Sequence, residues 1–322
     1  MTMPELPSLK SLKMKGTNKQ LGLICNLTTL SSFSIGVNKT SNGTESPPFV
    51  QKKMTFRYFR SLENLVITAS EDLTPLLDEE EETRGLSTSL HSLGIESCNW
   101  IFSPPHPLAF WKNLTSLLSL MIYHCDDLVY WPEAEFRGLN SLKNMVIYGC
   151  NKLVGPLRLP LSSSSSGDGE LLPNLEVLNI YQCDGLLELP KLPASLRSLL
   201  VTNCPKINSL TEGLRHATAL ESVRIWFCPS LTSLPVDLGH LTALKMMSIR
   251  GLPGLESFPQ GLRQLAALKG MQIINCSKLL SLPEGMQGLT ALQDLCISNC
   301  PLLSSLPEGC NDDSPALSVW RL

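Results

Sequence analysis

A fixed spacing of leucines constrains this chain more than any other feature of its sequence. The pattern Leu-x-x-Leu-x-Ile, with apolar replacements, recurs thirteen times, and four consecutive steps between copies are each 24 residues long. A regular period of this kind indicates a repeated packing unit, so repeats rather than independent domains should set the architecture. The thirteen copies begin at Leu9, Leu30, Leu62, Leu90, Leu117, Leu142, Leu175, Leu196, Leu220, Leu244, Leu268, Leu292 and Leu317.

The composition agrees with one repeated apolar unit. Leucine accounts for 62 of the 322 residues, whereas charged residues make up 17% and aromatic residues 6%. Ordinary globular domains carry roughly 25% charged residues. The formal net charge is −3, which provides no basic field, so we expect no nucleic acid partner.

The sequence also lacks recognisable targeting segments. No apolar run reaches the roughly 18 residues that a membrane span needs, and the first residues lack the basic and apolar parts of a signal peptide. We therefore expect no membrane span and a cytoplasmic location, with a nuclear or peripheral plasma-membrane location as variants. Without export, the glycosylation sequons are interpreted as chance matches; they lie at Asn26, Asn38, Asn42 and Asn113.

The C-terminal half contains the complete unit. Its first part alternates as Leu220-x-x-Val223-x-Ile225, which predicts a short strand with one buried face. A later Leu-x-x-Leu predicts a turn on the opposite side, and a proline recurs beside it, at Pro235, Pro259, Pro283 and Pro307. Periods of roughly 20 to 29 residues are typical of leucine-rich repeats. We predict an α/β solenoid: a leucine-rich repeat horseshoe of about 13 repeats, with a parallel concave β-sheet and short helical or irregular convex segments.

We interpret residues 1–322 as a single leucine-rich repeat domain. Residues 1–110 hold irregular repeats with long loops, and residues 111–322 hold regular repeats of about 24 residues. Residues 161–170 form a predicted flexible Ser/Gly insertion, and residues 38–53 form a second polar loop. The acidic run at 78–82 is typical of a solvated loop and, as the alternative, of a docking site for a basic partner.

Eight of the eleven cysteines share one position in the repeat, three residues after the strand Ile or Val. We call them the ladder cysteines: Cys98, Cys125, Cys150, Cys183, Cys204, Cys228, Cys276 and Cys300. Because their spacing equals the repeat period, we predict one buried structural thiol per unit rather than a metal or redox site. Many unpaired thiols also favour a reducing compartment.

Motifs for enzymatic chemistry are missing from the sequence. The phosphate-binding loop Gly-x-x-x-x-Gly-Lys-Ser/Thr, the Gly-x-Ser-x-Gly nucleophile elbow and the zinc motif His-Glu-x-x-His do not occur. The five histidines are scattered, and His124 is interpreted as a surface or turn residue. We therefore expect no enzyme, no catalytic or metal-binding residues and no cofactor in this chain.

A candidate binding surface follows from the strand alternation. The residue directly after each strand Ile or Val points out of the predicted concave face, and this column contains three tyrosines, a tryptophan and an arginine. Tyr, Trp and Arg are enriched at binding hot spots. The predicted partner-binding residues are Tyr123, Tyr148, Tyr181, Arg224, Trp226 and Arg250. The alternative is that the aromatic side chains pack on one another along the sheet.

The repeated phrase Cys-x-x-Leu-x-x-Leu-Pro-x-Gly-Leu resembles the leucine-rich repeat region of plant intracellular immune receptors of the coiled-coil, nucleotide-binding, leucine-rich-repeat type. Residues 276–286 and 300–309 carry it, and the N-terminal stretch 6–12 is similar to another phrase of that region. The resemblance covers nearly the whole chain. It implies a non-enzymatic sensor and autoinhibitory region that perceives a pathogen effector, directly or through a guarded host protein.

Such receptors also carry a nucleotide-binding switch, which these residues do not contain. The resemblance therefore implies ATP or ADP only in an upstream domain, and partners that include the nucleotide-binding domain of the same receptor. The first and last repeats lack polar caps, so we expect both termini to belong to a longer or truncated protein. The alternative is a freestanding scaffold or adapter in signalling or ubiquitin transfer; a secreted inhibitor of microbial enzymes would need a signal peptide.

Overall fold

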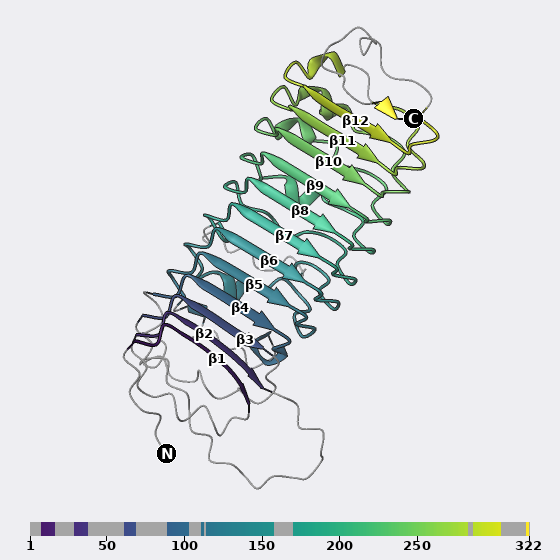
Figure 1. Cartoon of the computed structure of the whole chain (residues 1–322). Coiled ribbons are helices and arrows are strands. Elements are labelled where there is room, and N and C mark those ends of the chain that lie inside the picture. The colour runs from purple at the N-terminus through teal and green to yellow at the C-terminus, as the bar shows by residue number, and fades with distance from the viewer. Residues whose placement is uncertain are drawn as a thin grey trace, which may run out of the picture. The chain divides into compact units, whose positions relative to one another are not determined.

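The computed structural model describes residues 8–16, 29–37, 61–68, 89–102, 111–112, 114–157, 170–282, 286–303 and 320–321. The chain divides into two compact units. Unit 1 comprises Met1–Leu128 and Pro132–Lys143, and unit 2 comprises Val129–Trp131 and Asn144–Leu322. In each unit, parallel strands lie side by side in the order in which they occur along the chain (Figure 1). The prediction of one domain with a change of regularity at residue 111 stays a prediction.

Unit 1 contains five strands among its described residues. They are β1 (Ser11–Gly16), β2 (Ser32–Val37), β3 (Asn64–Thr68), β4 (Ser92–Glu96) and β5 (Ser119–Tyr123). Each strand pairs in parallel with the next, so that the equivalent residues Phe33, Leu65, Leu93 and Leu120 lie in one row. The described residues of the unit also include the short helices η2 (Asn99–Phe102) and α4 (Glu133–Phe136).

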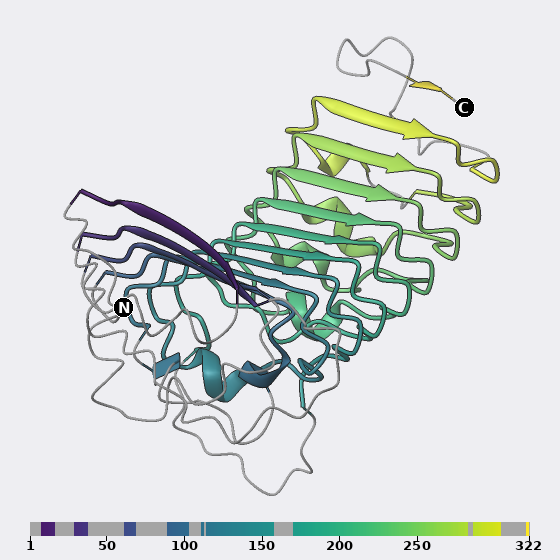
Figure 2. The same cartoon turned by 60° about the horizontal axis from the view of Figure 1, so that its bottom comes forward.

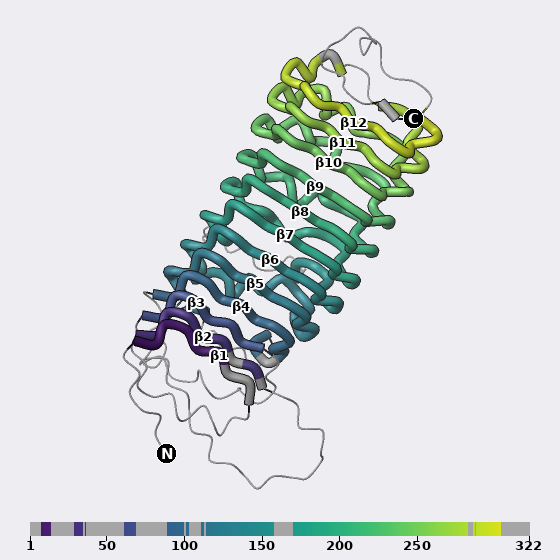
Figure 3. Tube along the Cα trace, in the orientation of Figure 1, coloured from purple at the N-terminus to yellow at the C-terminus, as the bar shows by residue number. Residues whose placement is uncertain are grey.

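Unit 2 contains the regular repeats. Its strands are β6 (Asn144–Tyr148), β7 (Val177–Tyr181), β8 (Ser198–Thr202), β9 (Ser222–Trp226), β10 (Met246–Arg250), β11 (Gly270–Ile274), β12 (Asp294–Ser298) and β13 (Trp320–Arg321). Figure 3 shows the nearly identical coils that carry β9 to β12. Short helices alternate with the strands: α5 (Thr211–Leu214), η3 (Leu238–His240), η4 (Gln260–Gln264) and η5 (Met286–Gly288).

The predicted repeat register is confirmed strand by strand. For twelve of the thirteen repeats, the described strand begins two residues after the leucine that opens the repeat, as Ser222 follows Leu220. The predicted fold class, a leucine-rich repeat solenoid with a parallel sheet and short helical segments, is also confirmed. Figure 2 shows the helical segments of each unit on the side away from its strands.

The alternation of side chains explains why each repeat folds in this way. In β9, Val223 and Ile225 point inward and are buried, whereas Arg224 between them is exposed. Leucines from the rest of the same repeat are buried as well, including Leu231, Leu238 and Leu241. Each such side chain contributes about 1.5–3 kcal/mol when it is fully removed from water. A single repeat has too few of them to form a core, so neighbouring repeats must stack.

The ladder cysteines occupy the turn at the carboxyl end of the strands, as predicted. All eight are buried. Each thiol lies where it can donate to the carbonyl oxygen two residues earlier; the distance from Cys228 Sγ to the Trp226 oxygen is 3.4 Å. A backbone N–H three residues later closes the turn, from Leu231 to the Cys228 oxygen at 3.1 Å.

The residue before each ladder cysteine adopts a left-handed backbone conformation, which the sequence analysis did not anticipate. Among the described residues, φ lies between 50° and 66° at Ser97, His124, Gly149, Gln182, Asn203, Phe227, Gly251, Asn275 and Asn299, where Gly251 precedes Leu252 in the cysteine position. Glycine and asparagine tolerate this conformation best. It turns the backbone N–H toward the next strand, so that Asn203 N donates to Trp226 O at 3.0 Å.

Several predicted features lie outside the described residues. They are the polar loop at 38–53, the acidic run at 78–82, most of the Ser/Gly insertion at 161–170, and the prolines Pro283 and Pro307. The four sequons, including Asn113, also lie there. Of the remaining prolines, Pro259 is extended and precedes η4, where its missing N–H leaves no helix hydrogen bond unmade. Within the described ranges, every helix is too short to span a bilayer.

Because the Phe227 ring lies against Gly251, adding one methyl group at Gly251 is predicted to lower the stability of the fold strongly. A Cβ at Gly251 would lie 2.5 Å from Phe227 Cδ1, and φ of Gly251 is +63°. We expect Gly251→Ala to lower the free energy of unfolding by about 1–3 kcal/mol, since it adds both steric overlap and left-handed strain. Denaturant titration of the same change in a Phe227→Ala background should show a smaller loss; an equal loss would contradict the overlap.

Thiol burial predicts an order of chemical reactivity. Burial raises the pKa of Cys228 to about 12, so its thiolate is scarce at neutral pH, and the thiol is also out of contact with solvent. Cys296 points out of β12 and is only partly buried. We expect a brief iodoacetamide pulse on the folded chain to label Cys296 before Cys228, measured by mass spectrometry. Labelling of both at one rate, without denaturant, would contradict the buried ladder.

Candidate functional site

The outward face of unit 2 is built from the first, third and fifth residue of each strand. The pairing of the strands places these residues in straight columns. One column reads Tyr148, Tyr181, Thr202, Trp226, Arg250, Ile274 and Ser298, and the next reads Val146, Asn179, Leu200, Arg224, Ser248, Gln272 and Cys296. Five of the six predicted site residues therefore share this face, while Tyr123 belongs to unit 1.

The two tyrosines of this face contact each other. The ring centroids of Tyr148 and Tyr181 are 6.2 Å apart and their planes are inclined by 40°. This is a favourable aromatic pair between neighbouring strands. The alternative of self-packing along the sheet thus describes these two side chains, although both remain partly exposed.

β8 separates the tyrosine pair from the tryptophan. Thr202 lies between Tyr181 and Trp226 in the column and is 6% exposed, and Leu200 beside it is 9% exposed. Both outward side chains are therefore largely removed from solvent. The predicted aromatic surface is consequently two groups rather than one continuous stripe.

The second group, which we call the Trp226 cluster, consists of four connected side chains together with Arg224, which lies on the same face two residues before Trp226. The four connected residues are Trp226, Ser248, Arg250 and Gln272. The indole Nε1 of Trp226 donates to Ser248 Oγ at 3.0 Å, and that hydroxyl donates to Gln272 Oε1 at 3.1 Å. Arg250 Nη2 donates to the same Gln272 oxygen at 2.6 Å. Ser248 is 2% exposed and lies beneath the others.

Arg250 is held in place by two contacts. Its guanidinium carbon lies 4.9 Å from the centroid of the Trp226 ring, within the range of a cation–π interaction. The hydrogen bond from Nη2 to Gln272 restrains the position of the guanidinium. Arg250 Nε is buried without an acceptor, so approach from solvent is limited to the Nη end. Arg224 is exposed and makes no ion pair with any described residue.

Charges at the amino end of the same strands are paired, in contrast to this cluster. Glu221 accepts from Arg197 Nη1 at 2.8 Å and from Lys245 Nζ at 2.7 Å. The hydrogen bond and charge of Lys245, supported by Arg197, hold the pKa of Glu221 below its usual value. The carboxylate that directly precedes β9 is therefore already occupied.

Phe227 is a surface residue that the sequence analysis missed. It follows Trp226, adopts a φ of 55° and remains 47% exposed. A bulky residue in the left-handed region is uncommon and strained, and the equivalent positions of later repeats hold Gly251, Asn275 and Asn299. A phenylalanine where the repeat favours glycine or asparagine is the signal that identifies it in the sequence.

Comparison with known proteins supports the fold only. The structure of the Drosophila Toll–Spatzle complex aligns over 90% of this chain and 40% of that chain, with 15% identity and a TM-score of 0.55. The mouse RP105/MD-1 complex aligns over 91% and 52%, with 16% identity and a TM-score of 0.54. The leucine-rich repeat domain of the type III effector XopL aligns over 78% and 66%, with 24% identity and a TM-score of 0.42.

The chain is a leucine-rich repeat solenoid. It spans between two fifths and two thirds of the length of these three proteins. No protein-family model and no curated protein sequence matches the chain.

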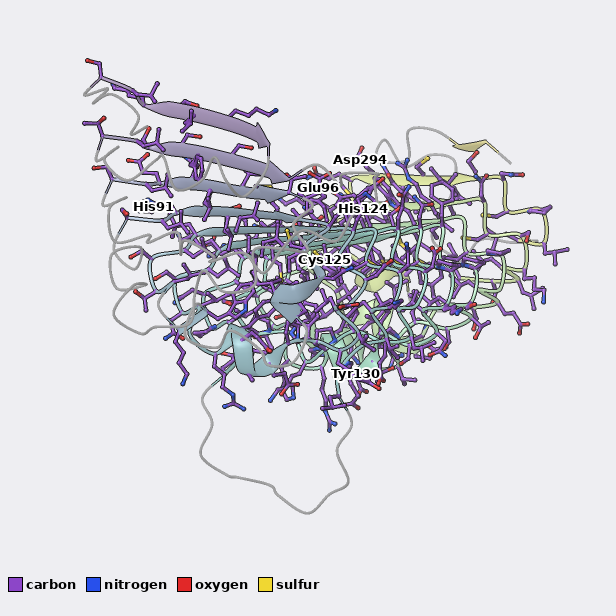
Figure 4. The ribbon with its side chains drawn as sticks, turned by 90° about the horizontal axis from the view of Figure 1, so that it is seen from below. His91, Glu96, His124, Cys125, Tyr130 and Asp294 are labelled. Atoms are coloured by element: carbon purple, nitrogen blue, oxygen red, sulfur yellow. The ribbon has the colours of Figure 1, made fainter. Side chains whose placement is uncertain are left out.

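Within each unit, the described histidines belong to different repeats. In unit 1, His91 precedes β4, whereas Glu96 and His124 lie at the carboxyl ends of β4 and β5, beside Cys125 (Figure 4). His124 lies in the turn after β5, as the sequence analysis proposed, and its φ is 52°. In unit 2, His240 Nε2 lies 3.0 Å from the Leu214 carbonyl oxygen. Over the described residues, no group of His, Cys, Asp and Glu side chains is arranged to hold a metal ion.

The shared acceptor in the Trp226 cluster predicts a measurable stability contribution. We expect Gln272→Leu to lower the free energy of unfolding by about 1–2 kcal/mol, because Ser248 and Arg250 both lose their acceptor while Ser248 remains buried. The matched control is Gln260→Leu, at an exposed position of η4, which should change stability by less than about 0.5 kcal/mol. Equal effects of the two changes in denaturant titrations would contradict the network.

Proposed function

We propose that this solenoid is a non-enzymatic protein-recognition module that binds its partner on the outward face of unit 2. The observation that carries the proposal is the Trp226 cluster. A tryptophan and an arginine are positioned there by buried hydrogen bonds, yet both remain accessible. Side chains that are ordered before binding lose little entropy when a partner arrives, and Trp and Arg are the types that dominate binding hot spots.

Two proteins with this fold support a recognition role. Toll was solved as a complex with Spatzle, and RP105 as a complex with MD-1. Their identity to this chain is low, so they support binding by this kind of scaffold and say nothing of the partner. A long parallel sheet whose outward residues vary from strand to strand suits that task, because its core residues stay constant.

The finer proposal is the sensor and autoinhibitory region of a plant intracellular immune receptor. Its support is the resemblance of the repeated phrase at 276–286 and 300–309. In this proposal the partner is a pathogen effector, a guarded host protein or the receptor's own nucleotide-binding domain, and the location is cytoplasmic. ATP or ADP would bind outside these 322 residues. The freestanding scaffold or adapter is the second candidate.

Quantitative affinity capture tests the recognition role. We expect the wild-type chain to retain a partner from leaf extract, and Trp226→Ala to lose most of it, on the order of tenfold. Arg263→Ala is the matched control, since Arg263 is exposed in η4 on the helical side. Retention of the same partner by all three chains would place the binding surface elsewhere.

The receptor proposal has a separate test in the transcript upstream of the Met1 codon. We expect an in-frame Gly-x-x-x-x-Gly-Lys-Ser/Thr phosphate-binding loop there. A stop codon immediately upstream would overturn the receptor proposal and favour the freestanding scaffold. Neither result bears on which face binds.

A further inference from the structure

We infer that the partner segment bound by the Trp226 cluster is acidic: a polypeptide segment whose carboxylates meet Arg224 and Arg250, with an apolar side chain beside them against Phe227. This inference rests on the proposed function, because it names the chemistry of the partner at the same face. It is carried by the charge of the face, by the geometry of Arg250 and by the position of Phe227.

The outward face has cations without anions. Strands β6 to β11 are described throughout, and their outward positions contain Arg224 and Arg250 but no Asp or Glu. The first acidic side chain on this face is Asp294, at the start of β12. The two guanidinium groups therefore present positive charge that the face itself does not neutralise.

Three cations of unit 2 form ion pairs elsewhere on the chain. Glu221 accepts from both Arg197 and Lys245 one residue before the strands begin, so these two cations share one carboxylate. Arg215 has Glu212 within 3.8 Å on the helical side. Arg224 and Arg250, by contrast, lie on adjacent strands of the outward face and make no ion pair with any described residue, so both can meet a carboxylate of a partner.

The geometry of Arg250 favours a carboxylate over a diffuse anion. Gln272 and the Trp226 ring fix the guanidinium plane, and the buried Nε leaves the Nη end to meet a partner. A planar, pre-ordered guanidinium forms short charge-assisted hydrogen bonds with a carboxylate and loses little entropy in doing so. Arg224, one strand earlier, adds a second positive charge to the same patch.

Phe227 supplies the apolar part of the recognition. Its ring lies across Gly251, the residue that directly follows Arg250. An aromatic side chain that is strained and half exposed adds little to folding, which makes a binding role the better explanation of its presence. Charge and apolar surface therefore occur next to each other at the carboxyl ends of β9 and β10.

A protein segment fits this patch better than a nucleic acid. Two arginines form a small positive area on a chain whose net charge is −3. Nucleic acid affinity grows with the number of phosphates neutralised, and it is usually supplied by a basic stripe. A local carboxylate with an apolar neighbour needs no such stripe.

The experiment is a selection on the purified full chain with a phage-displayed library of random peptides of about 12 residues, the length of a typical linear recognition segment. We expect enriched peptides to combine Asp or Glu with an aromatic or aliphatic residue. Synthetic versions should bind roughly tenfold more weakly to Arg224→Gln and to Arg250→Gln, and more weakly at high salt. Phe227→Asn should also weaken binding while it stabilises the fold.

Controls separate failure of this inference from failure of the proposed function. Arg263→Gln should bind the peptides like the wild type, and circular dichroism confirms that every variant is folded. Neutral peptides that need Trp226 but neither arginine would overturn the acidic partner and leave protein recognition in place. Peptides that bind all variants equally, or no enrichment at all, would overturn both. Tighter binding of oligothymidylate than of any peptide would overturn the acidic partner in favour of nucleic acid.

Discussion

Every repeat of this chain depends on its neighbours to exclude water from its leucines. Val223, Ile225 and Leu231 are buried only because adjacent repeats place equivalent side chains against them. Stacking also satisfies the backbone, since each strand uses its N–H and C=O groups to bind the next. The same requirement fixes which residues point outward. A strand cannot shift by one residue without burying Arg224 and exposing Val223, so the columns of the outward face follow from core packing.

Much of the fold was predictable because it repeats. The opening leucine of a repeat predicts its strand within a residue along most of the chain, and the ladder cysteines predict the turn after the strand. The left-handed residue before each cysteine was harder to predict. Asn and Gly occupy five of the nine positions, but Gln, His, Ser and Phe occur at the other four, so residue type marks the position only in part. What the position shares is a backbone N–H that reaches the next strand, and this requirement is visible only in three dimensions.

The candidate site was predictable as a column but not as a network. Strand alternation placed Trp226 and Arg250 on the outward face, and pairing puts them on neighbouring strands. The sequence did not indicate that Ser248 and Gln272, each an ordinary polar residue, connect them. Nor did it separate the tyrosine pair from the tryptophan, since that separation depends on how Thr202 and Leu200 are covered. Local alternation predicts direction, whereas contacts depend on side-chain length and rotamer.

Self-packing and recognition were opposed interpretations of the aromatic column, and the geometry makes them compatible. The contacts that hold Trp226 use its indole N–H and the ring face toward Arg250, which leaves part of the ring exposed. An arginine fixed over that ring binds with a smaller loss of entropy than a free one. Phe227 also supports a binding role. Its left-handed backbone is strained, and glycine or asparagine at this position would relieve that strain. Trp226 and Arg250 are thus ordered by internal contacts but keep part of their surface exposed, beside the strained Phe227. This combination is compatible with the proposed binding surface.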